Sequence, residues 1–160
     1  MSSTLTIYLK PKGVEETKAH PESLMWISRC EDMYSLFEEE GDIVWNFSSD
    51  EDYESGKVKY SDRYTDIDKY LLDKIFDELK DRIDNTNQRI AHNYKRIALT
   101  HSTTAKTEFG DEYDLLDDID HAQEYLEELK HTETQIGMLS RIMDHMKYSD
   151  VYEGLCANFS

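Results

Sequence analysis

The chain has 160 residues, a formal net charge of −17 at pH 7 and a hydrophobic content of 38%. So acidic a chain is repelled by nucleic acid and by anionic membrane surfaces, and its length suits one domain, or one small domain with an extension. Its eleven tyrosines, five phenylalanines and two tryptophans argue against intrinsic disorder, which is poor in aromatic residues.

The first 60 residues carry short elements of mixed type. Residues 4–10 alternate polar and apolar side chains and end at Pro11, which predicts a β-strand. The elements predicted after it are a strand over 24–27, a helix over 29–40, a strand over 43–47, an acidic loop over 48–56 and an edge strand over 57–60. Together they predict a small α+β unit over residues 1–62, with Trp26 and Trp45 in its core.

The apolar spacing then becomes helical. A stripe that repeats every seven residues predicts a helix that begins at Thr65 and runs to about residue 100. A second stripe predicts a helix over 111–148, and the polar residues 101–110 predict the connection between the two. Neither helix can bury its stripe alone, so the two are expected to fold back as an antiparallel hairpin over residues 63–150.

The pairing within this hairpin follows from the position of its turn. A turn centred near Lys106 places apolar residues opposite each other at four levels, namely Ile97 with Leu115, Ile90 with Ala122, Ile83 with Leu129 and Phe76 with Ile136. The C-terminal residues 151–160 are expected to dock on the N-terminal unit. The predicted fold class is therefore α+β, with a small strand and helix unit followed by a long, coiled-coil-like two-helix hairpin.

Acidic residues are concentrated in two blocks. The first block contains nine acids and no base, and its members are Asp111, Glu112, Asp114, Asp117, Asp118, Asp120, Glu124, Glu127 and Glu128. In a single helix these charges would be spaced about 3 Å apart, close to the ~3.4 Å spacing of phosphates along one DNA strand. The block therefore predicts a surface that occupies a basic groove normally filled by nucleic acid.

The competing interpretation of this block is internal pairing or simple solvation. Arg89, Lys95 and Arg96 lie beside it in the predicted hairpin, and Lys106 lies in the connection. Acids near a helix start are also stabilised by the helix dipole. The four bases would offset four of the nine charges, which leaves a negative remainder.

The second block extends from residue 31 to residue 66 and holds twelve acids against three bases. Its densest stretch is predicted as a binding loop made of Asp50, Glu51, Asp52, Tyr53 and Glu54. Tyrosine beside acids favours this interpretation, because tyrosine supplies contact area and hydrogen bonds at interfaces. The alternative is that the loop is only solvated.

Catalytic and metal-binding patterns are weak. Glu128 and His131 match the Glu-x-x-His element of di-iron bundles, but the facing seam offers isoleucines, a threonine and an asparagine in place of carboxylates. Cys30 and Cys156 have no metal-type spacing and no adjacent basic group that would clearly activate the thiol, so reduced, buried thiols are expected. No nucleophile elbow or glycine-rich phosphate loop occurs in the sequence, so we expect neither an enzyme nor a cofactor or metal.

These observations predict a non-enzymatic, cytoplasmic interaction protein, acting in a host's cytoplasm if the gene is viral. Its expected partner is a basic protein that handles nucleic acid, which it would block as a nucleic-acid mimic. An anti-defence inhibitor of a phage, of the anti-CRISPR type, is the most specific form of this hypothesis. The alternative is an assembly protein, such as a chaperone, adaptor or virion component, whose hairpin forms a homo-dimer or larger helical bundle.

Overall fold

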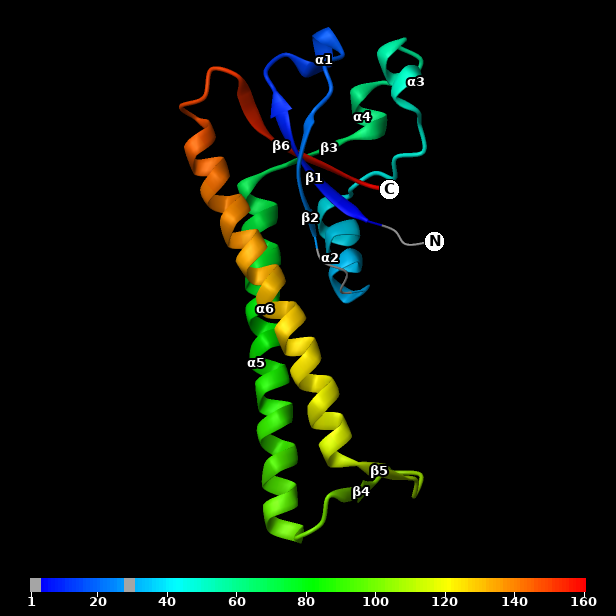
Figure 1. Ribbon diagram of the computed structural model, residues 1–160, viewed down its shortest axis with the longest axis vertical. Helices are drawn as coiled ribbons and strands as arrows, with labels where there is room; N and C mark the ends of the chain where they lie inside the picture. The colour runs from blue at the N-terminus through cyan, green and yellow to red at the C-terminus, as the bar shows by residue number, and fades with distance from the viewer. Residues whose placement is uncertain (1–3, 28–30) are drawn as a thin grey trace. The chain divides into compact units, whose positions relative to one another are not determined.

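The computed structural model describes residues 4–27 and 31–160, with side chains omitted for residues 31–33 (Figure 1). The chain forms two compact units. We call the first the sheet unit, which runs to Phe76 and resumes over Thr134–Ser160, and the second the hairpin unit, Asp77–Glu133. The predicted α+β class with a helical hairpin is confirmed.

A four-stranded antiparallel sheet organises the sheet unit. Its order is β2-β1-β6-β3, and the strands span Glu22–Ile27 (β2), Leu5–Pro11 (β1), Tyr152–Phe159 (β6) and Thr65–Ile67 (β3). The C-terminal strand β6 thus lies between β1 and β3, with Leu5 opposite Phe159. An interior position pairs both edges of a strand, and other elements pack on both faces of β6, so its last five residues before Ser160 are all buried.

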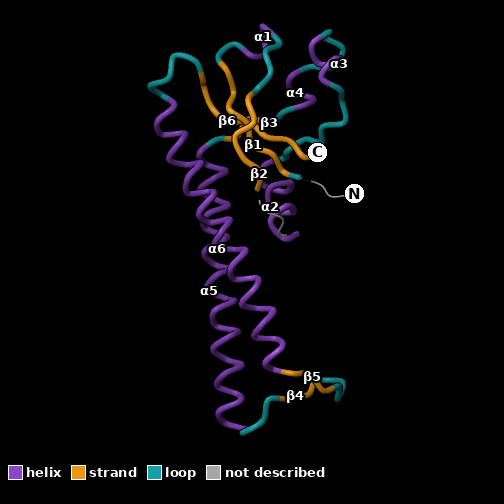
Figure 2. The backbone as a smooth tube through the Cα atoms, viewed as in Figure 1, coloured by secondary structure: helices purple, strands orange, loops and turns teal. Residues whose placement is uncertain are grey.

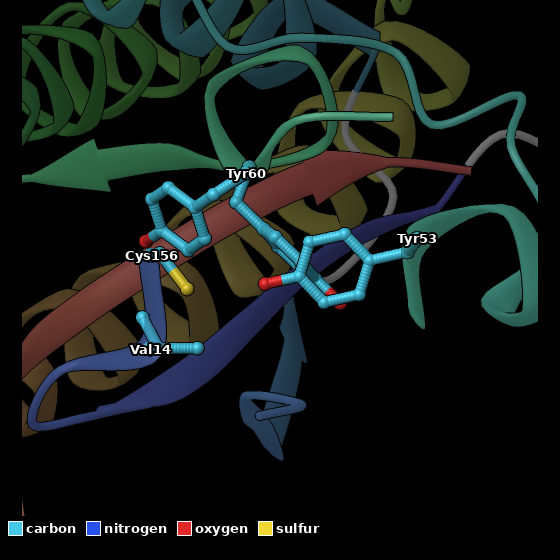
Figure 3. Close-up of a cluster of buried hydrophobic side chains, with 5 residues drawn as sticks. Val14, Tyr53, Tyr60 and Cys156 are labelled. Atoms are coloured by element: carbon cyan, nitrogen blue, oxygen red, sulfur yellow. The ribbon is translucent and has the colours of Figure 1, made fainter. Parts of the chain in front are cut away.

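The two faces of the sheet carry different cores. Tyr8 and Cys156 point to one face, where Cys156 joins a buried cluster with Val14, Tyr53, Tyr60 and Tyr64 (Figure 3). Three of its members come from short helices, which are Val14–Thr17 (α1), Asp50–Glu54 (α3) and Tyr60–Arg63 (α4), and Tyr64 directly follows α4. On the other face the ring of Tyr34, from α2 (Glu31–Gly41), packs edge-on against Phe159 at 5.6 Å.

Three predicted elements between residues 43 and 60 are wrong. The strand over 43–47 is reduced to a single parallel bridge between Trp45 and Phe159. The loop over 48–56 contains α3, which Ser49 caps by accepting a hydrogen bond from the Asp52 N–H at 3.2 Å. The edge strand over 57–60 is replaced by α4 and, further on, β3. Capping and tertiary pairing outweigh the alternation of side chains in segments this short.

The two tryptophans are not core residues, contrary to expectation. Trp26 lies on β2, an edge strand of the sheet, and its side chain is 69% exposed. Trp45 is 38% exposed and stacks between Phe47 and Phe159, at ring distances of 6.3 and 4.9 Å. Cys156 is a free, buried thiol as predicted, whereas Cys30 lies outside the described residues.

The long helices span Lys69–Thr100 (α5) and Leu115–Met146 (α6) (Figure 1). α5 begins later than predicted because Thr65 belongs to β3, and Asp68 accepts the helix-capping bond from the Leu71 N–H at 2.7 Å. α6 also begins later than predicted, because residues 112–114 form a strand.

The register of the helices agrees with prediction where the structure tests it. In the sheet unit, Phe76 and Ile136 line the same small cavity, as expected for one of the four predicted levels. In the hairpin unit, Asn93 donates a hydrogen bond to Asp118, which places these two residues between the predicted levels Ile90–Ala122 and Ile97–Leu115. The buried side chains Ile83 and Leu129 belong to the same unit.

Candidate functional site

A β-hairpin joins the two helices of the hairpin unit (Figure 2). Its strands are Thr104–Lys106 (β4) and Glu112–Asp114 (β5), in a segment predicted as a connection and a helix start. α5 stops at His101, which adopts a left-handed backbone with a φ of 54°. Asp114 then caps α6 by accepting the Leu116 N–H at 2.8 Å.

This hairpin corrects the geometry of the first acidic block. Asp111, Glu112 and Asp114 lie in the turn and in β5, not in a helix. The nine charges therefore do not follow one helix at the predicted spacing. Three of them belong to the turn and second strand of the β-hairpin, and the other six lie on α6.

Five of the six helical acids share one face of α6. They are spaced three or four residues apart, or directly adjacent, and all are exposed: Asp117, Asp120, Glu124, Glu127 and Glu128. At 100° per residue they fall within an arc of roughly 100°. The buried residues Leu115, Ile119 and Ala122 lie on the opposite side of the helix. We call these five residues the acidic stripe.

Asp118, the sixth helical acid, faces the neighbouring helix. Its carboxylate accepts hydrogen bonds from the Arg89 guanidinium and from the buried Asn93 amide. The Arg89 hydrogen bond holds the pKa of Asp118 below its ordinary value, with a further contribution from Asn93. Asp118 is therefore a structural group that joins α6 to α5, not a free charge at the surface.

Internal pairing neutralises little of this block. Among the residues that the structure describes, Asp118 is the one acid of the block in an ion pair. Arg96, expected to offset an acid, instead donates to the Tyr113 hydroxyl at 2.9 Å. Within the same described part of the chain, Lys95 and Lys106 make no ion pair with the block. Of the four bases predicted to compensate the block, Arg89 alone is seen to do so.

The second block differs from the first, because five of its twelve acids, including three of the four in its densest stretch, are paired with bases in the described chain. The ion pairs that involve it are Asp50 with Arg63, Asp52 with Lys57, Glu54 with His20, Asp66 with Lys10 and Glu40 with Lys74. The Arg63 guanidinium holds the pKa of Asp50 below its ordinary value. Of the predicted binding loop, Glu51 alone is an exposed acid without an ion pair among the described residues.

Tyr53, predicted to supply contact area in this loop, is fully buried. Its ring packs against Tyr64 at 5.8 Å and under the Arg63 guanidinium at 5.2 Å. Burial raises the pKa of its hydroxyl. The residue stabilises the sheet unit, and a partner cannot reach it without local opening.

The Cys156 thiol is buried and poorly reactive. Burial raises the pKa of the Cys156 thiol to about 12, so the thiolate is scarce at neutral pH. Within residues 4–27 and 31–160, no three His, Cys, Asp or Glu side chains gather in a metal-binding group. No described helix is long and apolar enough to cross a membrane.

Apolar side chains near the first acidic block are a feature that the sequence-based predictions missed. Phe109 is 91% exposed at the tip of the β-hairpin, and Leu99 and Leu116 are exposed at the helix ends that flank it. The sequence signal that could have predicted this exposed ring is the Phe109-Gly110 pair in an otherwise polar connection. No protein-family model, curated protein or solved structure matches the chain, so the geometry of these surfaces carries the functional argument.

Proposed function

We propose that this protein is a non-enzymatic binding protein whose acidic stripe occupies a basic surface of another protein and blocks it. The partner is a protein that handles nucleic acid, and the stripe competes with that nucleic acid. The protein acts in the cytoplasm, and an inhibitor of host defence encoded by a phage is the most specific form of this function.

The observation that carries the proposal is the alignment of unpaired charge on α6. Five exposed carboxylates of the stripe lie outside ion pairs in the described chain and on one helix face. From Asp117 to Glu128 the helix rises about 16 Å, so the stripe carries about one charge per 3–4 Å. This density is close to that of a nucleic-acid strand, and it favours the counterion release and steering that drive binding to basic grooves.

The second acidic block does not support the same role. In its densest stretch Asp50, Asp52 and Glu54 are paired with bases, and a paired exposed charge contributes little to attraction at a distance. We therefore confine the proposed surface to the hairpin unit. The proposed binding residues are Asp117, Asp120 and Glu124 with Glu127 and Glu128, whereas Asp118 holds the stripe in place.

The assembly alternative is not favoured by any single observation. In the hairpin unit, the apolar seam residues Ile119, Ala122 and Leu129 are already buried in one copy of the chain. A four-helix bundle is therefore not needed to cover them.

The test is the ionic-strength dependence of binding to a protein captured from the native host. Capture at 50 mM NaCl should be lost near 1 M NaCl, where the Debye length falls to ~3 Å, and added duplex DNA should compete for the captured protein. The variant Asp117→Asn/Asp120→Asn/Glu124→Gln should weaken binding roughly tenfold or more.

A matched control carries the same change in net charge elsewhere. Glu16→Gln/Asp62→Asn/Asp150→Asn removes three exposed acids of the sheet unit that form no ion pair in the described chain. This control should bind like the wild type. Capture that survives 1 M NaCl, or equal weakening by the two triple variants, would contradict the proposal.

A further inference from the structure

The tip of the β4–β5 hairpin displays an aromatic side chain where a turn needs none. A β-turn is closed by the Gly110 N–H donating to the Thr107 carbonyl at 3.0 Å, and Phe109 precedes the glycine. Gly110 has a φ of 84°, the left-handed conformation that glycine adopts without strain. Turn positions favour small polar residues, so turn formation does not account for a phenylalanine that is 91% exposed.

The chain between the helices is also longer than a connection requires. Residues 101–114 separate α5 from α6, whereas helix connections in bundles commonly take 2–8 residues. The additional residues build the β-hairpin, which projects to the side of the two helices and has Phe109 in its turn (Figure 1). The extra length of the connection therefore exposes the turn of the β-hairpin and is not needed to join the two helices.

Several hydrogen bonds fix the β-hairpin to the helices. The Leu115 N–H donates to the Thr103 carbonyl at 2.8 Å, and Arg96 donates to the hydroxyl of Tyr113 on β5. The Thr107 N–H closes the turn from the other side by donating to the Asp111 carbonyl at 2.8 Å. A loop held in this way loses little conformational entropy when it binds, which favours affinity.

Acids lie close to the exposed ring in sequence. Glu108 and Asp111 belong to the turn segment and Glu112 begins β5, and all three are exposed and outside ion pairs in the described chain; Lys106 is the one base of β4, the turn and β5. Phe109 has no ring contact among the described residues, whereas Phe47, equally exposed, stacks on Trp45. An apolar ring inside a negative rim is complementary to an apolar pocket inside a positive rim.

We propose that the β4–β5 tip is a second contact of the same interface, in which Phe109 enters an apolar pocket on the basic surface of the partner protein. This inference rests on the proposed function and assigns the tip the role of an anchor beside the stripe. Exposed aromatic residues in desolvated pockets commonly dominate binding energy, while charges around them set orientation and rate.

The charge at the tip decides between possible occupants. An anionic membrane or nucleic acid is repelled by the acids near Phe109 in the turn and at the start of β5, Glu108, Asp111 and Glu112. A second copy of the chain would bring the same acids against each other if the two tips met. A basic protein surface is the occupant whose charge matches the tip, and its apolar pocket is what the ring requires.

The experiment compares two equally exposed phenylalanines. Phe109→Ala and Phe47→Ala are measured for affinity to the protein that the wild type captures, at 50 mM NaCl and at 150 mM NaCl. Poly-L-lysine serves as a second probe that offers positive charge without an apolar pocket. Urea unfolding of each variant checks that the fold is intact, since neither side chain is buried.

Phe109→Ala should weaken binding to the captured protein about 30-fold, which corresponds to about 2 kcal/mol, and leave the salt dependence unchanged. Phe47→Ala should bind within about twofold of the wild type, and neither change should alter binding to poly-L-lysine, because hot-spot losses need a filled pocket. If both variants weaken binding equally, or if neither weakens it, the inference is overturned. The proposed function still stands in that case if the stripe variant Asp117→Asn/Asp120→Asn/Glu124→Gln weakens binding.

Other occupants give their own results. A wild-type dimer in sedimentation that dissociates on Phe109→Ala would assign the tip to self-association. Co-sedimentation with phosphatidylcholine vesicles that is lost on Phe109→Ala would assign it to a membrane. Either result overturns the inference. If the wild type captures no protein in a salt-dependent manner, the proposed function and the inference fail together.

Discussion

Glu124 lies at the centre of the acidic stripe, and its neutralisation should stabilise the protein. Three like charges are its helical neighbours, which are Asp120 at i−4, Glu127 at i+3 and Glu128 at i+4. Each like-charge pair at this spacing costs about 0.2–0.5 kcal/mol. Glu124→Gln removes three such pairs, so the free energy of unfolding should rise by about 0.6–1.5 kcal/mol at low salt. Glutamine and glutamate have nearly equal helix propensities, so propensity adds little.

The measurement is urea unfolding followed by circular dichroism at 20 mM and at 1 M NaCl. The gain should be largest at 20 mM and nearly absent at 1 M, because salt screens exposed charges. Asp117→Asn is the matched control, since Asp117 lies in the first turn of α6 and has one like-charged neighbour in the stripe, Asp120. Its repulsion is offset by a favourable helix-dipole interaction of about 0.3–1 kcal/mol, so this variant should show no gain.

A loss of stability on Glu124→Gln at low salt would refute this reasoning. It would mean that the Glu124 carboxylate has a stabilising partner and that the stripe is not a row of free charges. A gain that persists at 1 M NaCl would show that the effect is not electrostatic. The predicted result instead identifies the stripe as a feature that lowers stability and is therefore explained by binding, not by folding.

Three further predictions concern groups that hold the fold. Arg89 lowers the folded pKa of Asp118, so the unfolded chain binds more protons than the folded chain. The contribution of Asp118 to stability is therefore present above the unfolded pKa of about 3.9 and is lost as pH falls through the folded pKa. Asp118→Asn should make the free energy of unfolding depend less on pH below about pH 5, as followed by circular dichroism. Cys156, with its pKa raised to about 12, should resist iodoacetamide at pH 8 until urea is added, and rapid native labelling at this site, mapped by mass spectrometry, would contradict its burial. Tyr53→Phe removes a buried hydroxyl without a hydrogen-bond partner among the described residues, so the urea midpoint should be unchanged or higher; a loss above about 1 kcal/mol would indicate a partner for that hydroxyl.

The long helices could be predicted because their signal is local and repeated. The spacing of Phe76 and Ile83 continues through the rest of α5, and a matching stripe on α6 constrains the register. Phe76 and Ile136 line the same cavity, as the predicted register of the two stripes requires. A period sustained over 32 residues is not outweighed by one tertiary contact.

The short elements could not be predicted in the same way, because their partners are distant in sequence. β3 has three residues and exists because Thr65 pairs with Ala157, ninety-two positions later. Tyr53 belongs to an acidic stretch that resembles a solvated loop, yet α3 turns its ring into the core beside Tyr64. In both places the pairing partner, which the local sequence does not contain, determines the structure.

The two acidic blocks show why charge density alone does not locate a binding surface. Bases from separate elements reach the second block, as when Arg63 pairs with Asp50 and His20 lies 2.7 Å from Glu54. On α6, Arg89 reaches inward to Asp118, but the five stripe residues point away from α5 and its bases. A helix can direct one acid toward its neighbour and the next acids away from it because successive residues differ by 100°. The unpaired charge is therefore set by helical phase, and the acids at that phase are the ones on which a partner with a basic surface can act.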